Sequence, residues 1–280
     1  MRDAAVTRLL IVDDDPSVHE ALAPVLRRHG TVQDLYDGSE ALEHLKKPAC
    51  DVVVAGQGRN GFDAFELLRR VHSIRPEPRV ILTGDPDPMR VIHAIRARAF
   101  SYFHKPLAPA SLADMVQQAL EADSWKDDIR VVSARPEWMT LEIRCKFGAN
   151  ERATQFLREI QTDLPPAIRE DVAVAFRELL MNAIEHGAKS DPKKRVRVSL
   201  IRTAAFLMGY VQDPGTGFSL NALPHAAISN PEDSPTRHVE VRIEQGQRPG
   251  GFGILLTRNM VDELLYNERG NAALFIKHLK

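Results

Sequence analysis

Cysteine is scarce in this sequence of 280 residues: there are two, and they lack the paired spacing of a zinc site. This excludes a disulfide scaffold and a cysteine-based metal centre, and it favours a reducing compartment. Long apolar runs and a signal-peptide pattern are also missing, so the sequence predicts no membrane segment and a cytoplasmic location. Neither charge is in excess, because 37 basic residues stand against 38 acidic ones, and a nucleic-acid partner is therefore not expected.

The composition supplies enough hydrophobic side chains for ordinary cores. Hydrophobic residues make up 44% of the chain and charged residues 27%, which is typical of folded domains, and the length fits one to two of them. A polar stretch of mixed charge, residues 121–130, separates two different sequence patterns. We therefore expect a first domain at residues 1–122, a linker at 123–130 and a second domain at 131–280.

Five short apolar segments alternate with five segments of helical periodicity in the first domain. A continuous apolar run such as residues 9–12 is typical of a strand covered on both faces, and Pro16 suits the first turn of a helix. The alternation predicts an α/β fold, a doubly wound five-stranded parallel sheet with its functional residues at the carboxyl ends of the strands. The predicted strands are 9–12, 32–35, 52–55, 80–83 and 100–104, and the predicted helices are 16–26, 39–45, 64–71, 89–98 and 111–122.

Polar residues stand at the ends of these strands. Asp13 and Asp14 follow the first strand, Thr83 ends the fourth, and Lys105 follows the fifth, which contains Tyr102. Over residues 7–122 this pattern resembles the receiver domain of bacterial response regulators. The resemblance implies that Asp13 and Asp14 hold magnesium and that Thr83 and Lys105 contact a phosphoryl group. It also implies that Tyr102 is the aromatic residue that moves with the switch, and that the peptide bond after Lys105 is cis.

Gly56 departs from the receiver pattern, because it stands where the family has its phosphoacceptor aspartate. An aspartyl phosphate needs a carboxylate at that point, and residues 57–60 offer none. Asp63 belongs to the loop before the third helix and does not replace it. We therefore expect a pseudo-receiver that acts by constitutive contact with a partner or with the second domain. Its magnesium site should be weak or vestigial, because the acidic pair lacks a third oxygen ligand.

The second domain contains an amphipathic helix that ends in the segment 177–187, Arg-Glu-Leu-Leu-Met-Asn-Ala-Ile-Glu-His-Gly. Positions four apart lie one above the other on a helix, so Glu178 and Asn182 are placed to serve one ligand. Gly187 is expected to be the C-terminal cap of this helix.

Two glycine-rich segments follow. Residues 213–218, Asp-Pro-Gly-Thr-Gly-Phe, come directly after a strand-like run, and residues 250–253, Gly-Gly-Phe-Gly, open another helix. A carboxylate at a strand end can accept a hydrogen bond from the amino group of adenine. Glycines allow close backbone approach, and a helix N-terminus offers free amides to phosphate. These segments therefore indicate a nucleotide site.

In this order and spacing, the three segments resemble the ATP-binding fold shared by gyrase and histidine kinases, the GHKL superfamily, and within it the anti-sigma-factor serine/threonine kinases. The resemblance implies an α+β sandwich, a mixed sheet with helices on one face, that binds ATP and Mg²⁺. Glu178 would be the general base, Asn182 would coordinate magnesium and Asp213 would bind the adenine amino group. Residues 219–249 would form a lid. The glycines that would shape the nucleotide pocket are Gly215, Gly217, Gly251 and Gly253.

The resemblance also implies partners. The expected target is an anti-anti-sigma protein of the STAS type, phosphorylated on Ser or Thr, with a sigma factor as second partner and a homodimer as the family's usual assembly. A histidine kinase is the weaker interpretation, because the ten-residue join has no room for a dimerisation domain with an acceptor histidine. A non-catalytic module that sequesters a partner, with ATP structural or absent, stays open, because a complete pocket does not prove turnover.

Overall fold

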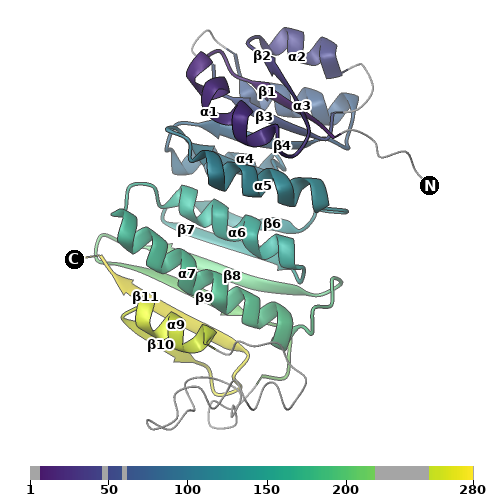
Figure 1. Cartoon of the computed structure of the whole chain (residues 1–280). Coiled ribbons are helices and arrows are strands. Elements are labelled where there is room, and N and C mark those ends of the chain that lie inside the picture. The colour runs from purple at the N-terminus through teal and green to yellow at the C-terminus, as the bar shows by residue number, and fades with distance from the viewer. Residues whose placement is uncertain (1–6, 46–49, 59–61, 218–251, 280) are drawn as a thin grey trace. The chain divides into compact units, whose positions relative to one another are not determined.

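The computed structural model describes residues 7–45, 50–58, 62–217 and 252–279. Contacts divide the chain into two compact units, Met1–Lys126 and Asp127–Lys280, and each unit is built around one β-sheet (Figure 1). Within the described ranges, every helix is too short or too polar to cross a lipid bilayer.

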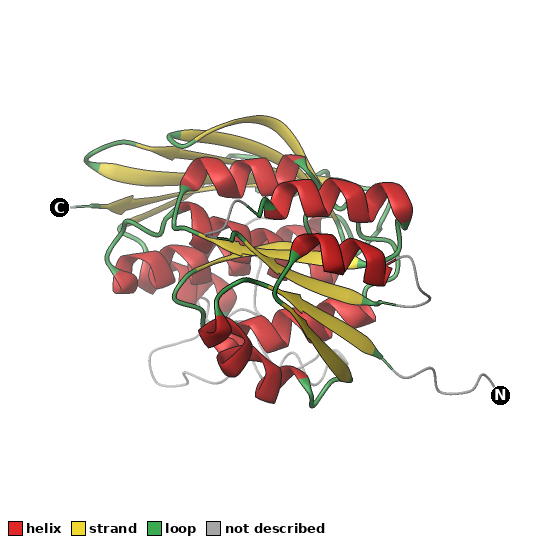
Figure 2. Ribbon diagram, turned by 90° about the horizontal axis from the view of Figure 1, so that it is seen from above, coloured by secondary structure: helices red, strands yellow, loops and turns green. Residues whose placement is uncertain are grey.

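The first unit has the predicted sheet of five parallel strands, in the order β2-β1-β3-β4-β5, with helices on both faces (Figure 2). The central strands β1, β3 and β4 are buried along almost their whole length, which explains their continuous apolar sequences. The strands are β1 Arg8–Val12, β2 Thr31–Leu35, β3 Val52–Gly56, β4 Arg79–Gly84 and β5 Ser101–His104, and the helices are α1 Pro16–Leu26, α2 Gly38–Leu45, α3 Ala64–Ile74, α4 Pro88–Arg96 and α5 Pro109–Glu121.

Aspartates start three of these helices at the carboxyl edge of the sheet. Asp15, Asp63 and Asp87 each accept a hydrogen bond from the backbone N–H two residues on, and so cap α1, α3 and α4. The core on the α1 and α5 side extends to Trp125, whose ring centroid lies 5.3 Å from that of Phe100. Trp125 is therefore a core residue of the first unit.

The second unit is a six-stranded sheet in the order β10-β11-β9-β8-β7-β6. Every neighbouring pair is antiparallel, so the expectation of a mixed sheet is wrong. Two helices separate β7 from β8, and the chain therefore crosses the sheet twice and enters β8 at the end where it left β7. The strands are β6 Ile129–Arg135, β7 Trp138–Arg144, β8 Arg195–Arg202, β9 Phe206–Gln212, β10 Glu263–Tyr266 and β11 Ala272–His278.

Three helices lie on one face of this sheet (Figure 1). The longest contributes a buried stripe at helical spacing that includes Val172, Phe176 and Leu180. Its carboxyl end reaches the edge of the sheet where β9 ends, and this brings the segments singled out in the sequence together. The helices are α6 Phe147–Ile160, α7 Pro166–Asn182 and α9 Gly253–Met260.

Candidate functional site

The helix that carries Glu178 and Asn182 does not end at Gly187. Beyond α7 the chain makes a π-helical turn, Ala183–Gly187, in which the Ala188 N–H donates to the Ala183 carbonyl at 2.9 Å. The residues with positive φ come later, at Lys189 and Ser190. The prediction of a glycine cap at 187 is therefore wrong. Single π-helical turns are rare and are frequently found at functional sites.

Close packing explains the glycine at position 187. A Cβ atom added to Gly187 would overlap the carboxylate of Asp213, and one added to Gly215 would lie 2.5 Å from the Gly187 carbonyl oxygen. Gly217 has φ +84°, and a Cβ there would overlap the Arg269 carbonyl oxygen. The three glycines therefore let the end of the helix, the segment after β9 and the β10–β11 turn approach one another.

Asp213 is fixed at the centre of this contact. Its backbone N–H donates to the Asn271 carbonyl at 3.0 Å, and the Asn271 side-chain amide donates to the Asp213 carbonyl at 3.2 Å. The Gly215 N–H donates to Asp213 Oδ1 at 2.6 Å, whereas Oδ2 accepts no hydrogen bond from the described residues. Burial raises the pKa of Asp213, and the hydrogen bond from Gly215 opposes this. The site thus presents one carboxylate oxygen as an acceptor.

Two asparagines behind Asp213 were missed by sequence reasoning. Asn271 is buried, and its Oδ1 accepts from Asn267 Nδ2 at 2.9 Å. Asn267 Oδ1 in turn accepts from the N–H groups of Asn271 and Ala272. The sequence signal at this place, Gly270-Asn271, indicates a hairpin turn, and it contains nothing that distinguishes a turn from a support for Asp213.

Glu178 and Asn182 converge on the first residue of α9. A Cβ atom on Gly253 would lie 2.8 Å from Glu178 Oε2 and 3.5 Å from Asn182 Nδ2. α9 has no side-chain cap at its N-terminus, so its first backbone amides are available to an anion. The structure therefore brings together Glu178, Asn182 and Gly253, and α7 with its π-helical turn links them to the Asp213 cluster. Gly251 and the predicted lid lie outside the described residues.

The pKa of Glu178 is raised, mainly because the side chain is half-buried. Arg177 opposes the shift, with Nη1 3.5 Å from Glu178 Oε1, while the nearby carboxylates of Glu151 and Glu185 reinforce it. Arg177 is itself committed to Glu151, with Nε 2.8 Å from Oε1. Carboxylates with raised pKa values in such positions are typical of general bases.

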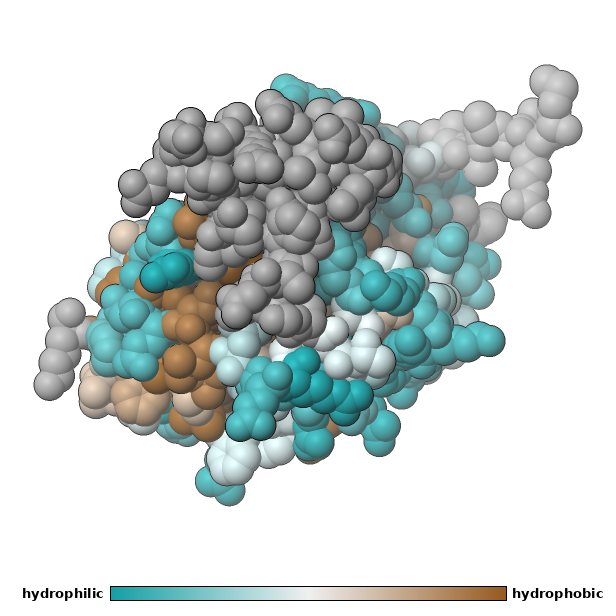
Figure 3. All heavy atoms as spheres, turned by 90° about the horizontal axis from the view of Figure 1, so that it is seen from below, coloured by the Kyte–Doolittle hydropathy of each residue, from teal (hydrophilic) through white to brown (hydrophobic). Residues whose placement is uncertain are grey.

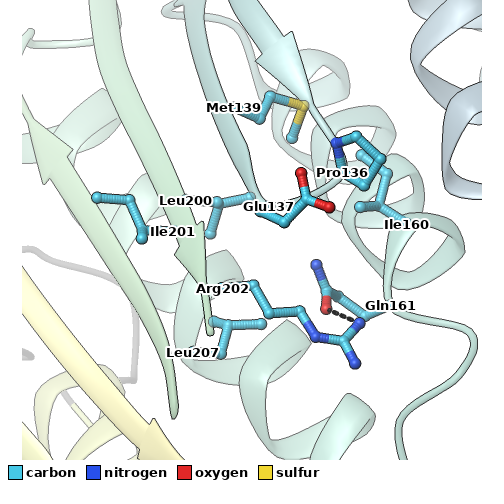
Figure 4. A pocket seen from close by; sticks show the side chains of 9 residues that line it. All are labelled: Pro136, Glu137, Met139, Ile160, Gln161, Leu200, Ile201, Arg202 and Leu207. Atoms are coloured by element: carbon cyan, nitrogen blue, oxygen red, sulfur yellow. Dashed lines mark hydrogen bonds between the residues drawn. The ribbon is translucent and has the colours of Figure 1, made fainter. Parts of the chain in front are cut away.

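A small hollow lies elsewhere on the second unit. Its lining includes residues from the beginning of β7 and the end of β8 (Figure 4), and β7 and β8 run antiparallel, so this is the end of the sheet remote from Asp213. Arg202 beside it is bound to Gln161 at 3.0 Å and to both carboxylate oxygens of Asp163 at 2.6 Å. The hollow therefore offers no free charged group that would mark a second site.

In the first unit, the predicted receiver residues meet at the carboxyl edge of the sheet. Lys105 Nζ lies 2.7 Å from Asp13 Oδ2, and Asp13 is 1% exposed. A Cβ atom on Gly56 would overlap Asp13 Oδ2 and lie 3.1 Å from Thr83 Oγ1. The Asp13 carboxylate thus fills the space that a side chain at position 56 would need. Asp14 lies beside it, near Gly58, and the described residues contain no group of three metal-ligating side chains.

Tyr102 is buried in the same unit. Its hydroxyl group donates to the Asp85 carbonyl at 2.7 Å, and a Cβ atom on Gly84 would lie 2.7 Å from that hydroxyl oxygen. Gly84 therefore provides the room that Tyr102 occupies. The peptide bond between Lys105 and Pro106 is cis, as the resemblance implied.

Replacing Asp13 by alanine is expected to destabilise the first unit by about 3 kcal/mol, because it leaves the Lys105 ammonium group without its buried partner. Urea unfolding of the full chain in a Trp138→Phe background measures this, since Trp125 is then the sole tryptophan and reports on the core of this unit. The control is Asp85→Ala, which removes an exposed carboxylate at the same edge. Equal midpoints for the two variants would show that the pair with Lys105 contributes nothing.

Comparisons with known proteins agree with this division of the chain. Residues 9–117 match the family model "Response regulator receiver domain", and residues 148–277 match "Histidine kinase-like ATPase domain". The curated relatives include the C4-dicarboxylate transport transcriptional regulatory protein DctD of Pseudomonas aeruginosa, 33% identical over 119 residues, and the DNA-binding response regulator MtrA of Mycolicibacterium smegmatis, 34% identical over 122 residues. Each alignment spans 42% of this chain, but only 26% of the first relative and 52% of the second.

Solved structures resemble the first unit alone. The BeF3-activated DrrB receiver domain is 28% identical with a TM-score of 0.39, and the match covers 42% of this chain and 99% of that one. The signal receiver domain of an HD domain-containing protein from Pseudomonas fluorescens is 28% identical with a TM-score of 0.40, and the match covers 43% and 91%. By its two family matches, the chain combines a response regulator receiver domain at its N-terminal end with a histidine kinase-like ATPase domain at its C-terminal end.

Proposed function

We propose that this protein is a signalling regulator whose second domain binds magnesium-ATP and phosphorylates a serine or threonine of a protein partner. The observation that carries the proposal is the convergence of Glu178 and Asn182 on the N-terminus of α9, linked through α7 to Asp213. A general base, an amide oxygen for magnesium, free helix amides and an acceptor for adenine are the groups that phosphoryl transfer from ATP requires.

Each residue has a chemically suitable role. Asp213 Oδ2 accepts a hydrogen bond from the exocyclic amine of adenine, while Gly187 and Gly215 leave room for the base. The Asn182 side-chain oxygen is a ligand for Mg²⁺, which neutralises the phosphate charge when it is bound. The Gly253 end of α9 holds the phosphates through backbone amides. Glu178, with its raised pKa, takes the proton of the attacking hydroxyl group.

The partner is expected to be an anti-anti-sigma protein of the STAS type, with a sigma factor as a second ligand, and the setting is expected to be cytoplasmic. The first domain would act as a pseudo-receiver. Support comes from the pair between Asp13 and Lys105, which occupies the space beside Gly56 and gives this site a neutral, filled arrangement without phosphate. Its control over the second domain would then depend on contact and not on phosphorylation or on magnesium at Asp13 and Asp14.

The test is phosphate transfer to a STAS-type protein. The full chain is incubated with magnesium-ATP and candidate STAS proteins, and intact mass followed by peptide mapping locates any phosphate. We expect one phosphate on a serine or threonine of the target, and none on the regulator after treatment with acetyl phosphate. An equimolar complex that forms equally well without nucleotide, and without any transfer, would instead establish a non-catalytic module that sequesters its partner.

A further inference from the structure

One face of the six-stranded sheet has no helix of the described residues on it. α6, α7 and α9 lie on the other face (Figure 1), and side chains alternate between the two along each strand. Val198 and Val211, paired in register, are buried on the helix side, whereas Arg197 points to the opposite side. In Figure 4, Leu200 points toward the hollow on the helix side and Ile201 points away from it. We call the side without helices the outer face.

The strand register aligns two rows of side chains across the outer face. The first row begins with glutamate on β10, continues with four apolar residues and ends with arginine on β6, and Trp138 within it is 56% exposed. The second row begins with Leu265, also 56% exposed, Leu274 and Tyr210, and continues with hydroxyl side chains. The first row consists of Glu263, Ile276, Met208, Ile201, Trp138 and Arg135.

These rows form an apolar stripe of the size found at the core of protein interfaces. With strands about 4.8 Å apart and a rise of about 3.3 Å per residue, the stripe extends about 24 Å across the sheet and about 13 Å along it. Monomers rarely expose continuous apolar patches much larger than a few hundred Å². A standard interface buries about 800 Å² per partner around such a core. Figure 3 shows a continuous hydrophobic area on the molecule seen from below.

The charges at the two ends of the first row indicate what covers it. When two sheets pack face to face about a two-fold axis parallel to the strands, the strand order of one copy is reversed over the other. Glu263 then lies opposite Arg135 of the second copy, and Met208 lies opposite Ile201 of the second copy. A two-fold axis across the strands would instead place Glu263 against Glu263. The row is complementary to itself in the first arrangement alone.

The polar row nearer to Asp213 is compatible with the same arrangement. It contains Gln212, Arg197 and Glu142 on β9, β8 and β7. After reversal of the strand order, Arg197 lies opposite Gln212 of the second copy, and Glu142 lies opposite Ala272 of the second copy. No like charges meet, and this row supplies a polar rim between the apolar stripe and the candidate nucleotide site.

We propose that the protein forms a homodimer through the outer face of this sheet, with the row from Glu263 to Arg135 packed against the same row of a second copy. The proposal is independent of phosphoryl transfer. It requires the outer face to be free for a second copy, and it leaves the candidate nucleotide sites accessible at the sheet edges.

Charge reversal with mixing tests this geometry. Glu263→Arg and Arg135→Glu each set like charges against each other twice in a homodimer, so each variant is expected to dimerise at least about tenfold more weakly than the wild type. In an equimolar mixture both contacts become attractive, and a heterodimer should form with close to wild-type affinity. Sedimentation equilibrium of the full chain measures the affinities, and native mass spectrometry identifies the mixed dimer. The control is Glu268→Arg, the same charge change in the same hairpin but outside the row.

Every outcome bears on the proposal. Recovery on mixing supports it and also excludes misfolding of the single variants, because an unfolded chain would not regain affinity. A monomeric wild type at about 100 μM, far above the dissociation constants of specific interfaces, would overturn it. It would mean that another protein or another part of this chain covers the outer face. Unchanged dimerisation of both variants, or failure of the mixture to recover, would place the dimer contact elsewhere.

Discussion

Asp213→Asn is expected to weaken binding of magnesium-ATP by about a hundredfold or more, because a polar site that is built for one hydrogen-bond pattern rejects its inverse strongly. Asp213 Oδ1 is already bound by the Gly215 N–H, so Oδ2 is the acceptor for the adenine amine. An asparagine would keep its oxygen toward Gly215 and turn an NH₂ group toward another donor. Isothermal titration of magnesium-ATP into the full chain measures the loss.

The design includes two comparisons. Asp262→Asn makes the same chemical change at an exposed position of the same domain and should bind as the wild type does. Asn271→Ala removes the amide that holds the Asp213 backbone and should give an intermediate affinity. Saturable binding of equal strength in wild type and Asp213→Asn would exclude Asp213 from base recognition. No binding to the wild type would mean that the protein acts through its surfaces as a scaffold.

Glu178→Gln is expected to retain ATP binding and to lose phosphoryl transfer by about 10²- to 10⁴-fold, the usual contribution of a general base. The side chain keeps its size and its place beside Gly253, but it cannot take a proton. Calorimetry and a single-turnover transfer assay separate the two effects. A matched control is Glu185→Gln, which removes a more exposed carboxylate one turn beyond Asn182.

The raised pKa of Glu178 also predicts a pH dependence. The carboxylate must be ionised to act as a base, so the transfer rate of the wild type should fall as the pH drops through the raised value, above the ordinary glutamate pKa of 4.5. The same shift means that ionisation opposes folding. The contribution of Glu178 to stability is greatest below that ordinary pKa and is lost as the pH rises through the raised one. A rate that is independent of pH down to the ordinary pKa would argue against the role.

The fold of the first unit could be predicted almost completely from the sequence, because strict alternation of buried strands and amphipathic helices admits few arrangements. The register then brings Asp13, Thr83 and Lys105 to one edge, as expected. The position of the Asp13 carboxylate could not be predicted. It depends on the space left beside Gly56, which no periodicity encodes.

In the second unit, the sequence indicated the right segments but not all of their contacts. Glu178, Asn182 and Gly253 meet as a nucleotide site requires. Gly187 was assigned to a helix cap, since glycine after a helix usually is one, whereas its small size serves Asp213, 26 residues further along the chain. The sheet was expected to be mixed, because the resemblance, and not a counted number of helix crossings, determined the expectation.

The contact between Asp13 and the space beside Gly56 also bears on the history of the first domain. A glycine codon becomes an aspartate codon by one base change, so the phosphoacceptor of a receiver would seem easy to regain. In this structure an aspartate at position 56 would overlap the Asp13 side chain that Lys105 now binds. We infer that mutation back at position 56 alone yields a damaged domain and not a working one. A lineage carrying this pair would therefore have to change two positions together, and its loss of the acceptor behaves as a ratchet.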